Sequence, residues 1–489
     1  MEKQQYNDDD DQEVAPPAEA PNPATAMGVA ALAQAYRDGS VTPTQAVEAC
    51  LDAYARLDDK LHAWQNVDAE GARRAAAAAT AQFASRGDIS SLPVFLGIPF
   101  GLKDLVDMEG FPTGKGSVAR VAVAAASSAP ITKCLLASGG IYMGKLNTVE
   151  FATGAWGTNE SVGAPVNPWS RDKPLACGGS SSGSGVAVAS GMLPCAVGTD
   201  TGGSVRVPAA FCGIVGLKTT KDLLSTDGIH PLSHTFDTPG PLARSVEDCA
   251  LMCAAMMPSS EAASFSAACS SSMRAGVHGL RLACMGEKGR SLVMNADVLA
   301  AFDAALDVLR SLGAEVTTFD WDVSGTNQTM SVIGMSEGYY YNREVLDDSS
   351  VKIDSTAYSR LIAGKKYSAF DYIAASIERE AMTKMWHEGM GDCECIAWLS
   401  PTAPTCTLPL DELDPVSATA TVFTRPANFL GLCAISVPTG PMEGSIDEGA
   451  LPTSLQITCK GGDEAMALRI AKAYESARGP LAQPPHFAL

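Results

Sequence analysis

Positive charge is scarce in this sequence of 489 residues, where 35 lysines and arginines face 55 acidic residues and leave a net charge of −20. Nucleic acid and anionic membranes repel such a chain at long range, so we expect neither as a partner. Long apolar runs are missing as well. Because a helix needs about 18 or more consecutive apolar residues to span a bilayer, the sequence predicts no transmembrane helix.

Metal-ligand spacings and paired-cysteine motifs are also missing. The six histidines form no HExxH pattern, and none of the fourteen cysteines belongs to a CxxC pair. We interpret the cysteines as small buried hydrophobes in a reducing compartment. The N-terminus has neither the cationic nor the apolar region of a secretory signal. Together these absences predict a cytoplasmic protein that uses no metal and no cofactor.

The chain divides into a short tail and one large body. Residues 1–26 are acidic and proline-rich, with no apolar stripe, and predict a disordered tail. Residues 27–485 alternate helical patterns with short apolar runs, which favour strands buried on both faces. We therefore predict a single-domain α/β fold with helices on both faces of a large mixed β-sheet. Residues 286–392 are more polar and predict an irregular insertion.

A loop of glycine and serine, CGGSSSGSG at residues 177–185, stands inside this body. A phosphate-binding GxxxxGK[ST] loop is excluded because no lysine follows the glycines, and a GxGxxG loop because Val188 replaces the last glycine. The segment also fits a GxSxG nucleophile elbow with Ser181 at its centre. That interpretation needs a late histidine, and only His387 and His486 lie well downstream.

A third interpretation combines this loop with two other segments. In GTDTGGSVRVP, Ser204 follows two glycines at the end of an apolar strand. The backbone N–H groups of Thr201, Gly202, Gly203 and Ser204 would then form an oxyanion hole, since glycines let the backbone approach a ligand closely. In GIPFGLKD, Lys103 ends another apolar run, where desolvation favours the neutral amine and makes it a candidate base. Serine with lysine is a known alternative to serine with histidine.

The long segment GGSSSGSGVAVASGMLPCAVGTDTGGSVRVPAAFCGIVGLK resembles the signature of the amidase signature family. The runs LPVFLGIPFGLKD, GPLARSVEDCALM and CIAWLSPTAPT resemble other parts of the same family, so the resemblance spans residues 27–478. It implies the amidase signature fold and a Ser-cisSer-Lys triad. Carried over by motif, Ser204 is the nucleophile, Ser180 the bridging serine after a cis bond from Gly179, Lys103 the base and Ser181 a supporting residue.

The resemblance leaves three functions open. One is a stand-alone hydrolase of small amides or carbamates, acting as a monomer or homodimer. Another is the A subunit of the tRNA-dependent amidotransferase, although Thr219 stands where that protein has proline. The last is a non-catalytic scaffold, which the intact triad disfavours. The resemblance implies that residues 286–392 help to shape the substrate channel. Because residues 286–400 include several aromatic side chains, we expect an aryl or arylalkyl substrate; they are Tyr339, Tyr340, Tyr341, Trp386 and Trp398.

Overall fold

A computed structural model describes residues 23–487 apart from 86–88, 120–122 and 442–449. Its centre is one sheet of eleven strands. In their order across the sheet the strands are β1 (Trp64–Val67), β3 (Ile141–Leu146), β2 (Pro99–Lys103), β4 (Cys195–Asp200), β6 (Thr238–Ala243), β5 (Val215–Lys218), β10 (Cys433–Gly440), β11 (Thr453–Cys459), β9 (Ala397–Pro401), β7 (Arg281–Met285) and β8 (Glu315–Phe319). The predicted mixed sheet is confirmed: β2 runs parallel to β3 and β4, whereas β4, β6, β5, β10, β11 and β9 follow one another antiparallel.

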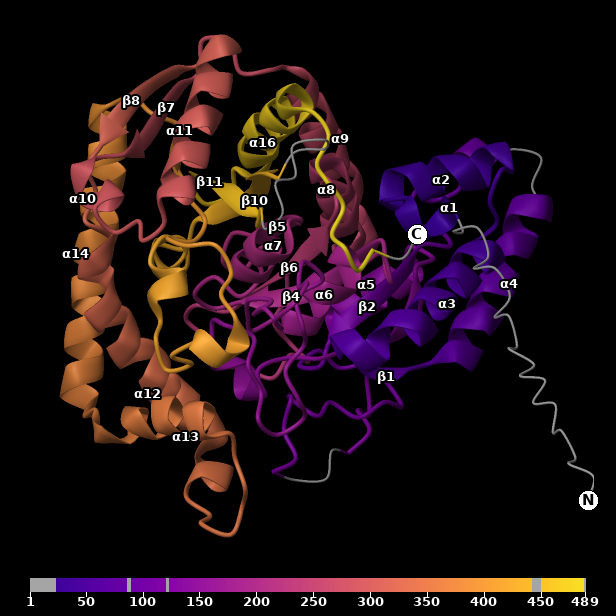
Figure 1. Ribbon diagram of the computed structural model, residues 1–489, viewed down its shortest axis with the longest axis horizontal. Coiled ribbons are helices and arrows are strands. Elements are labelled where there is room, and N and C mark those ends of the chain that lie inside the picture. Colours follow the sequence, from indigo (N-terminus) through magenta and orange to yellow (C-terminus); the bar gives the residue numbers. More distant parts are fainter. Residues whose placement is uncertain (1–22, 86–88, 120–122, 442–449, 488–489) are drawn as a thin grey trace, which may run out of the picture.

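Helices cover both faces of this sheet, as predicted (Figure 1). They are α1 (Pro23–Ala26), α2 (Val29–Asp38), α3 (Pro43–Leu61), α4 (Ala69–Ser85), α5 (Pro130–Ala137), α6 (Ser182–Ala189), α7 (Arg206–Cys212), α8 (Val246–Ala255), α9 (Ser259–Arg274), α10 (Glu287–Arg290), α11 (Ala296–Ser311), α12 (Thr326–Leu346), α13 (Ser355–Ile362), α14 (Ala369–Asp392), α15 (Arg425–Phe429) and α16 (Glu464–Arg478). Helix α3 begins at a capping box, in which the Thr42 side chain accepts a hydrogen bond from the Gln45 N–H.

The apolar strands supply two cores because successive side chains point to opposite faces of a strand. On β4, Cys195 and Val197 join the core beneath α8 and α16, whereas Ala196 joins the core beneath α3 and α6. Every residue of β4 is buried. The uninterrupted apolar pattern of such strands therefore reflects cover on both faces rather than one buried face.

Strand β6 has no apolar alternation and contains Pro239 and Pro241. Proline cannot donate to a sheet ladder, so this segment gave no strand signal. The prolines are tolerated because the β5–β6 ladder pairs only Leu242 and Ala243 of β6. The prolines therefore lie in the part of β6 that pairs with β4 alone.

The expectation of irregular structure over 286–392 is wrong. This stretch is largely helical and contains α11, the 21-residue α12 and the 24-residue α14. The long helices α12 and α14 pack against each other on the opposite side of the molecule from α3 and α4 (Figure 1). Its sequence looked irregular because α12 buries polar and small residues, including Thr329, Glu337 and Asn342, instead of an apolar stripe.

The end of the expected tail also needs correction. Residues 23–26 form α1, in which Ala24 and Thr25 are buried. Arg244 donates hydrogen bonds from its guanidinium to the carbonyl oxygens of Thr25 and Met27. The tail prediction for residues 1–22 lies outside the described residues. The folded body thus includes residues 23–26, which had been assigned to the tail.

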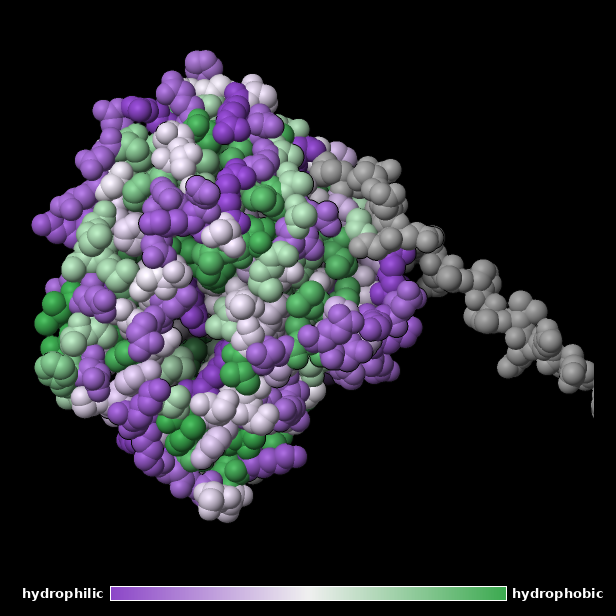
Figure 2. All heavy atoms as spheres, turned by 60° about the vertical axis from the view of Figure 1, so that its left-hand side comes forward, coloured by the Kyte–Doolittle hydropathy of each residue, from purple (hydrophilic) through white to green (hydrophobic). Residues whose placement is uncertain are grey.

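The exterior carries interspersed hydrophilic and hydrophobic residues on the face that Figure 2 shows. Within the described ranges, no helix combines the length and the apolar character needed to cross a bilayer.

Candidate active site

Two parallel strands bring the lysine and the serine segments to one edge of the sheet. Strand β2 ends at Lys103 and its parallel neighbour β4 ends at Asp200, so the carboxyl ends of both strands meet there. In open α/β sheets this is the edge at which ligands bind. The loop that follows β4 and the loop that precedes α6 lie at the same edge. Segments that are distant in the sequence therefore meet at one site.

Lys103 is fully buried at this edge. Its Nζ lies 2.7 Å from Ser180 Oγ and 2.8 Å from Thr199 Oγ1. Burial lowers the pKa of Lys103 to about 7, although the charges of Asp237 and Asp200 oppose this shift. A substantial fraction of the amine is therefore neutral near pH 7, as a base requires.

The bond between Gly179 and Ser180 is cis, as the resemblance implied. The carbonyl oxygen of Ser180 accepts hydrogen bonds from Thr148 Oγ1 at 2.9 Å and from the Val149 N–H at 3.2 Å. Gly179 lies so close to neighbouring backbone that a Cβ there would come within 2.8 Å of the Gly157 nitrogen. The glycine thus lets the chain pass close enough to aim Ser180 at Lys103.

Ser181 does not face the pocket. It is fully buried, and its Oγ donates to the Thr199 carbonyl oxygen and accepts from the Thr199 N–H, both at 3.2 Å. Its own N–H donates to the Ser204 carbonyl oxygen at 3.2 Å. Ser181 therefore ties the serine loop to β4 and to the Ser204 loop. This position is incompatible with a nucleophile elbow centred on Ser181.

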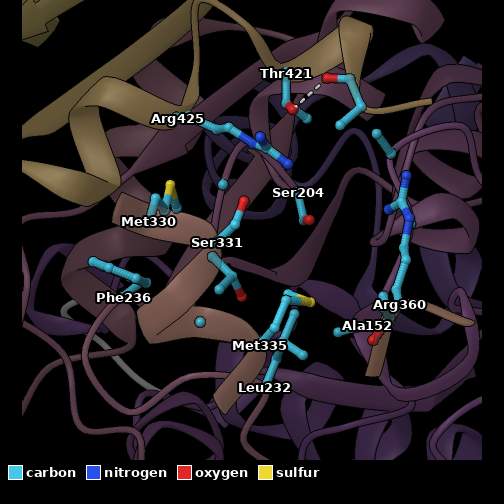
Figure 3. A pocket seen from close by; sticks show the side chains of 17 residues that line it. Ala152, Ser204, Leu232, Phe236, Met330, Ser331, Met335, Arg360, Thr421 and Arg425 are labelled. Atoms are coloured by element: carbon cyan, nitrogen blue, oxygen red, sulfur yellow. Dashed lines mark hydrogen bonds between the residues drawn. The ribbon is translucent and has the colours of Figure 1, made fainter. Parts of the chain in front are cut away.

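Ser204 lies on the loop between β4 and α7, and it opens onto a pocket (Figure 3). Among the described residues, its Oγ has no hydrogen-bond partner. The Ser181 N–H donates to the Ser204 carbonyl oxygen, and this hydrogen bond links the segment that contains Ser180 to the segment that contains Ser204. The structure thus brings Lys103, Ser180 and Ser204 to one site, with the lysine beneath the serine loop and Ser204 at the pocket.

The loop before Ser204 is shaped by Asp200. Its carboxylate accepts hydrogen bonds from the Gly203 N–H at 2.7 Å and from the Val205 N–H at 3.1 Å. Gly203 has a φ of +134°, and a Cβ there would meet Thr424 Oγ1 at 2.2 Å, so only glycine fits. The Gly203 N–H was expected in the oxyanion hole, but it is engaged by Asp200. The N–H groups of Thr201, Gly202 and Ser204 remain as donors.

A buried ion pair fixes Asp200 in turn. Its carboxylate lies 2.9 Å from the Arg206 guanidinium, and both side chains are fully buried. Arg206 also donates to the side-chain oxygens of Gln456 and Asn428. Burial alone would raise the pKa of Asp200, but the charge and hydrogen bonds of Arg206 hold it well below its usual range. This network joins β4, α7, α15 and β11 around the loop.

The pocket takes its opposite wall from α12 and from residues 418–425 (Figure 3). Apolar side chains on this wall and its floor are Leu232, Phe236, Met330 and Met335. Two arginines, Arg360 and Arg425, complete the lining, which includes no aspartate or glutamate among the residues that the structure describes.

The aromatic residues expected at the substrate do not line this pocket. Trp386 and Trp398 are buried in the main core, and Tyr340 is exposed. The Tyr339 hydroxyl donates to Asp347. Tyr341 lines a neighbouring hollow together with His234 and Asp237. None of these five rings therefore supports the expected aryl preference directly, and Phe236 is the aromatic residue in the described lining of the pocket.

Several site residues had escaped the sequence analysis. Thr199, which contacts Lys103, was hidden inside an apolar strand motif. Asp237, whose pKa burial raises to about 6, accepts a hydrogen bond from Thr201 Oγ1 and carries no motif of its own. Arg360 and Arg425 lie in segments with no recognisable spacing to the serines. For Arg425, the one sequence feature that could have indicated a site is the preceding run of small and apolar residues, TATVFT. Arg360 has no such feature.

Within the described ranges, no group of three or more histidine, cysteine or acidic side chains is arranged to hold a metal ion.

Comparisons with known proteins agree with this arrangement. The sequence profile described as Amidase matches residues 45–468. The A subunit of the glutamyl-tRNA(Gln) amidotransferase of Roseiflexus sp. (strain RS-1) is 31% identical over 478 residues, covering 90% of this chain and 94% of that protein. The 2-amino-5-chloromuconic acid deaminase of Comamonas testosteroni is 30% identical over 468 residues, covering 93% and 96%.

Among solved structures, the native peptide amidase from Stenotrophomonas maltophilia superimposes with a TM-score of 0.80 at 25% identity and covers 96% of this chain and all of that one. The match of the family profile extends over most of the chain, and it includes all three residues of the predicted triad. The chain therefore belongs to the amidase (amidase signature) family and is a hydrolase of carbon–nitrogen bonds.

Proposed function

We propose that this protein hydrolyses a small amide or carbamate through an acyl-enzyme formed on Ser204. The observation that carries the proposal is the fully buried Lys103 Nζ, 2.7 Å from Ser180 Oγ, in a loop that the Ser181 N–H links to Ser204 at the pocket. A lysine held against a serine, with no carboxylate of the described residues within ion-pair distance, is suited to moving a proton rather than to stabilising the fold.

In this mechanism the neutral Lys103 amine accepts the Ser180 proton while Ser180 accepts the proton of Ser204. The Ser204 oxygen attacks the carbonyl carbon, and the negative charge on the carbonyl oxygen is met by the N–H groups of Thr201, Gly202 and Ser204. The relay then delivers a proton to the leaving amine as the carbon–nitrogen bond breaks. Water attacks the acyl-enzyme along the same relay and releases the acid.

The finer substrate preference is for an aryl or arylalkyl amide or carbamate over acetamide. Support comes from the apolar part of the pocket, where Phe236, Met330 and Met335 offer contact area to a ring or chain. A buried aromatic contact contributes about 0.5–1.5 kcal/mol beyond its apolar area. A carbamate differs only in the alkoxy group on its carbonyl, so the same residues would serve it.

The second candidate is the A subunit of a tRNA-dependent amidotransferase, because a relative of that name is 31% identical to this chain. Such a protein would act on glutamine in a complex, whereas we propose a monomer or homodimer in the cytoplasm without macromolecular partners. The departure at Thr219 favours the stand-alone enzyme. A non-catalytic scaffold would turn over neither class of substrate.

The test is hydrolysis by the purified chain without ATP or other proteins. We expect an anilide, an arylalkyl amide or a phenyl carbamate to have a higher kcat/KM than glutamine or acetamide, measured as aniline or ammonia release. Ser204→Ala should abolish turnover. A tenfold or greater advantage in kcat/KM for glutamine would replace this proposal with the amidotransferase.

Dialysis against a chelator should leave the hydrolytic activity intact. A loss of activity that zinc restores would contradict the proposed mechanism.

A further inference from the structure

Two arginines enter the pocket beside Ser204 without a direct ion pair to any described carboxylate. Arg360 comes from α13 and Arg425 from the first residue of α15, and both are half-buried. Figure 3 shows their side chains on opposite sides of Ser204 in that view. Neither guanidinium lies within ion-pair distance of a carboxylate in the described part of the chain.

The few hydrogen bonds of these arginines position the guanidinium groups without neutralising them. Nη2 of Arg360 donates to the carbonyl oxygens of residues 415–417, at 2.6 Å for Val416. Nη1 of Arg425 donates to Asn327 Oδ1 at 3.2 Å. The Nε and Nη1 groups of Arg360, and the Nε and Nη2 groups of Arg425, have no acceptor among the described residues. Each arginine therefore keeps donors for another molecule.

Arg206 provides a comparison, because it is a buried arginine with a structural role. Its guanidinium is fully buried against Asp200 at 2.9 Å and against two side-chain oxygens. Arg425 has no such counter-charge among the residues described. Burial, and then the like charge of Arg360, lower its pKa to about 10, so it remains protonated at neutral pH. The charges of Asp414 and Asp354 act on Arg360 from beyond ion-pair distance, but no described carboxylate pairs directly with either guanidinium. Two such cations in one pocket are costly in free energy, and a bound anion offsets that cost.

We propose that Arg360 and Arg425 bind a carboxylate of the substrate, so that the enzyme acts on amides or carbamates of organic acids. This inference rests on the proposed function and names the substrate class of the same site. Arginine matches a carboxylate through paired, charge-assisted hydrogen bonds. The apolar wall formed by Phe236, Met330 and Met335 contacts the carbon chain or ring between the acid and the scissile carbonyl.

The same lining disfavours an amino acid. An α-ammonium group would lie near the two arginines, and the described lining of the pocket offers no aspartate or glutamate to receive it. Glutaramate, which is glutamine without its ammonium group, therefore fits the pocket better than glutamine. This difference separates a carboxylate subsite from a glutamine site.

The experiment compares glutaramate with valeramide, its uncharged counterpart, and succinanilate with butyranilide. For each pair the purified enzyme should favour the acid by about 100-fold in kcat/KM, mostly through a lower KM, because charged hydrogen bonds to a partly buried group are strong. Glutaramate should exceed glutamine by at least tenfold. Free glutarate should inhibit competitively at a lower concentration than pentanol.

Arg425→Gln should reduce the acid-over-neutral ratio at least 30-fold, and Arg360→Lys, which keeps the charge, should reduce it less than Arg360→Gln. The control Arg310→Gln changes an exposed arginine on α11 that pairs with Asp307, and it should keep the wild-type ratio. A raised KM with nearly constant kcat would mark lost binding rather than misfolding.

The outcomes separate this inference from the proposed function. If neutral amides are hydrolysed in a Ser204-dependent manner but the acids have no advantage, the carboxylate subsite is wrong and the hydrolase stands. An unchanged ratio in Arg425→Gln also refutes the subsite. If no amide in either series is turned over, the proposed function itself fails. Direct binding of glutarate in isothermal titration calorimetry, weakened in Arg425→Gln, would then still report the anion site.

Discussion

The two sides of the pocket are built in different ways. On one side, the ends of β2 and β4 hold Lys103, Ser180 and the Ser204 loop in a fully buried lattice of hydrogen bonds, anchored by the Asp200–Arg206 ion pair. On the other side, α12, α13 and α15 present apolar side chains and two arginines that form no direct ion pair with a described carboxylate. Under the proposed function, the sheet would hold the groups that carry out the chemistry, and the helical wall would set substrate choice.

The largest expected effect on activity comes from substitutions on the sheet side of the pocket, where Lys103, Ser180 and Ser204 lie. Ser204→Ala should lower kcat by about 10³ or more, because covalent catalysis is lost, and Lys103→Ala and Ser180→Ala should be comparably harmful. Steady-state hydrolysis of the best anilide measures this. The matched control is Ser190→Ala on the far end of α6, whose Oγ bonds only to the Ala187 carbonyl oxygen among the described residues. A Ser204→Ala variant with wild-type kcat, or an inactive Ser190→Ala variant, would refute the assignment.

A second change tests whether the ion pair supports the chemical side. Asp200→Asn leaves Arg206 buried without its counter-charge, and it should lower the free energy of unfolding by about 3–5 kcal/mol in urea titration. Asp307→Asn breaks a comparable pair with Arg310 at the exposed surface and should cost less than about 1 kcal/mol. Equal effects from the two substitutions would show that burial of the pair does not matter.

The pH dependence sharpens the same comparison. Since the base must be neutral and the pKa of Lys103 is about 7, kcat/KM should rise with pH through about 7 and level off above it. Below this range the lysine is protonated and cannot accept a proton. A neutral amide is the substrate of choice, because its own charge does not change. A rate that is flat from pH 6 to 8, or that falls as pH rises, would exclude Lys103 as the base.

The smallest effect is expected at the N-terminal end of the sequence. Removal of residues 1–22 should shift the Tm by no more than about 2 °C, because the segment is acidic and lacks an apolar stripe. Removal of residues 1–27 should lower it further, since the buried Ala24 and Thr25 and the bonds to Arg244 are lost. Equal shifts for the two truncations would contradict the boundary at Pro23.

The sequence predicted the sheet side of the site better than the helical side. Lys103, Ser180 and Ser204 lie in compact motifs of small residues, where the need for close backbone approach restricts the choice of amino acid. The mixed sheet followed from its apolar runs, although β1 and β8 lie outside those runs and Pro239 and Pro241 concealed β6. On the other side, α12 buries Glu337 and Asn342 and shows no helical stripe. Arg360 and Arg425 meet only through tertiary structure, so no local pattern joins them.

The tight packing around Ser204 also explains one error. Four consecutive N–H groups looked equally suited to an oxyanion, because the sequence shows the glycines but not the direction of each amide. The Asp200 carboxylate engages the Gly203 N–H, and that contact depends on the turn geometry at the end of β4.

The central claim is that Ser204 forms the acyl-enzyme, and mass spectrometry of a trapped intermediate tests it most directly. The purified enzyme is treated with a slowly hydrolysed aryl carbamate, digested and sequenced by fragmentation. We predict one carbamoyl group on Ser204 and none on Ser180 or Ser181, and no adduct in Lys103→Ala under the same conditions. An adduct on Ser181, or turnover of the carbamate with no adduct on Ser204 at any stage, would contradict it.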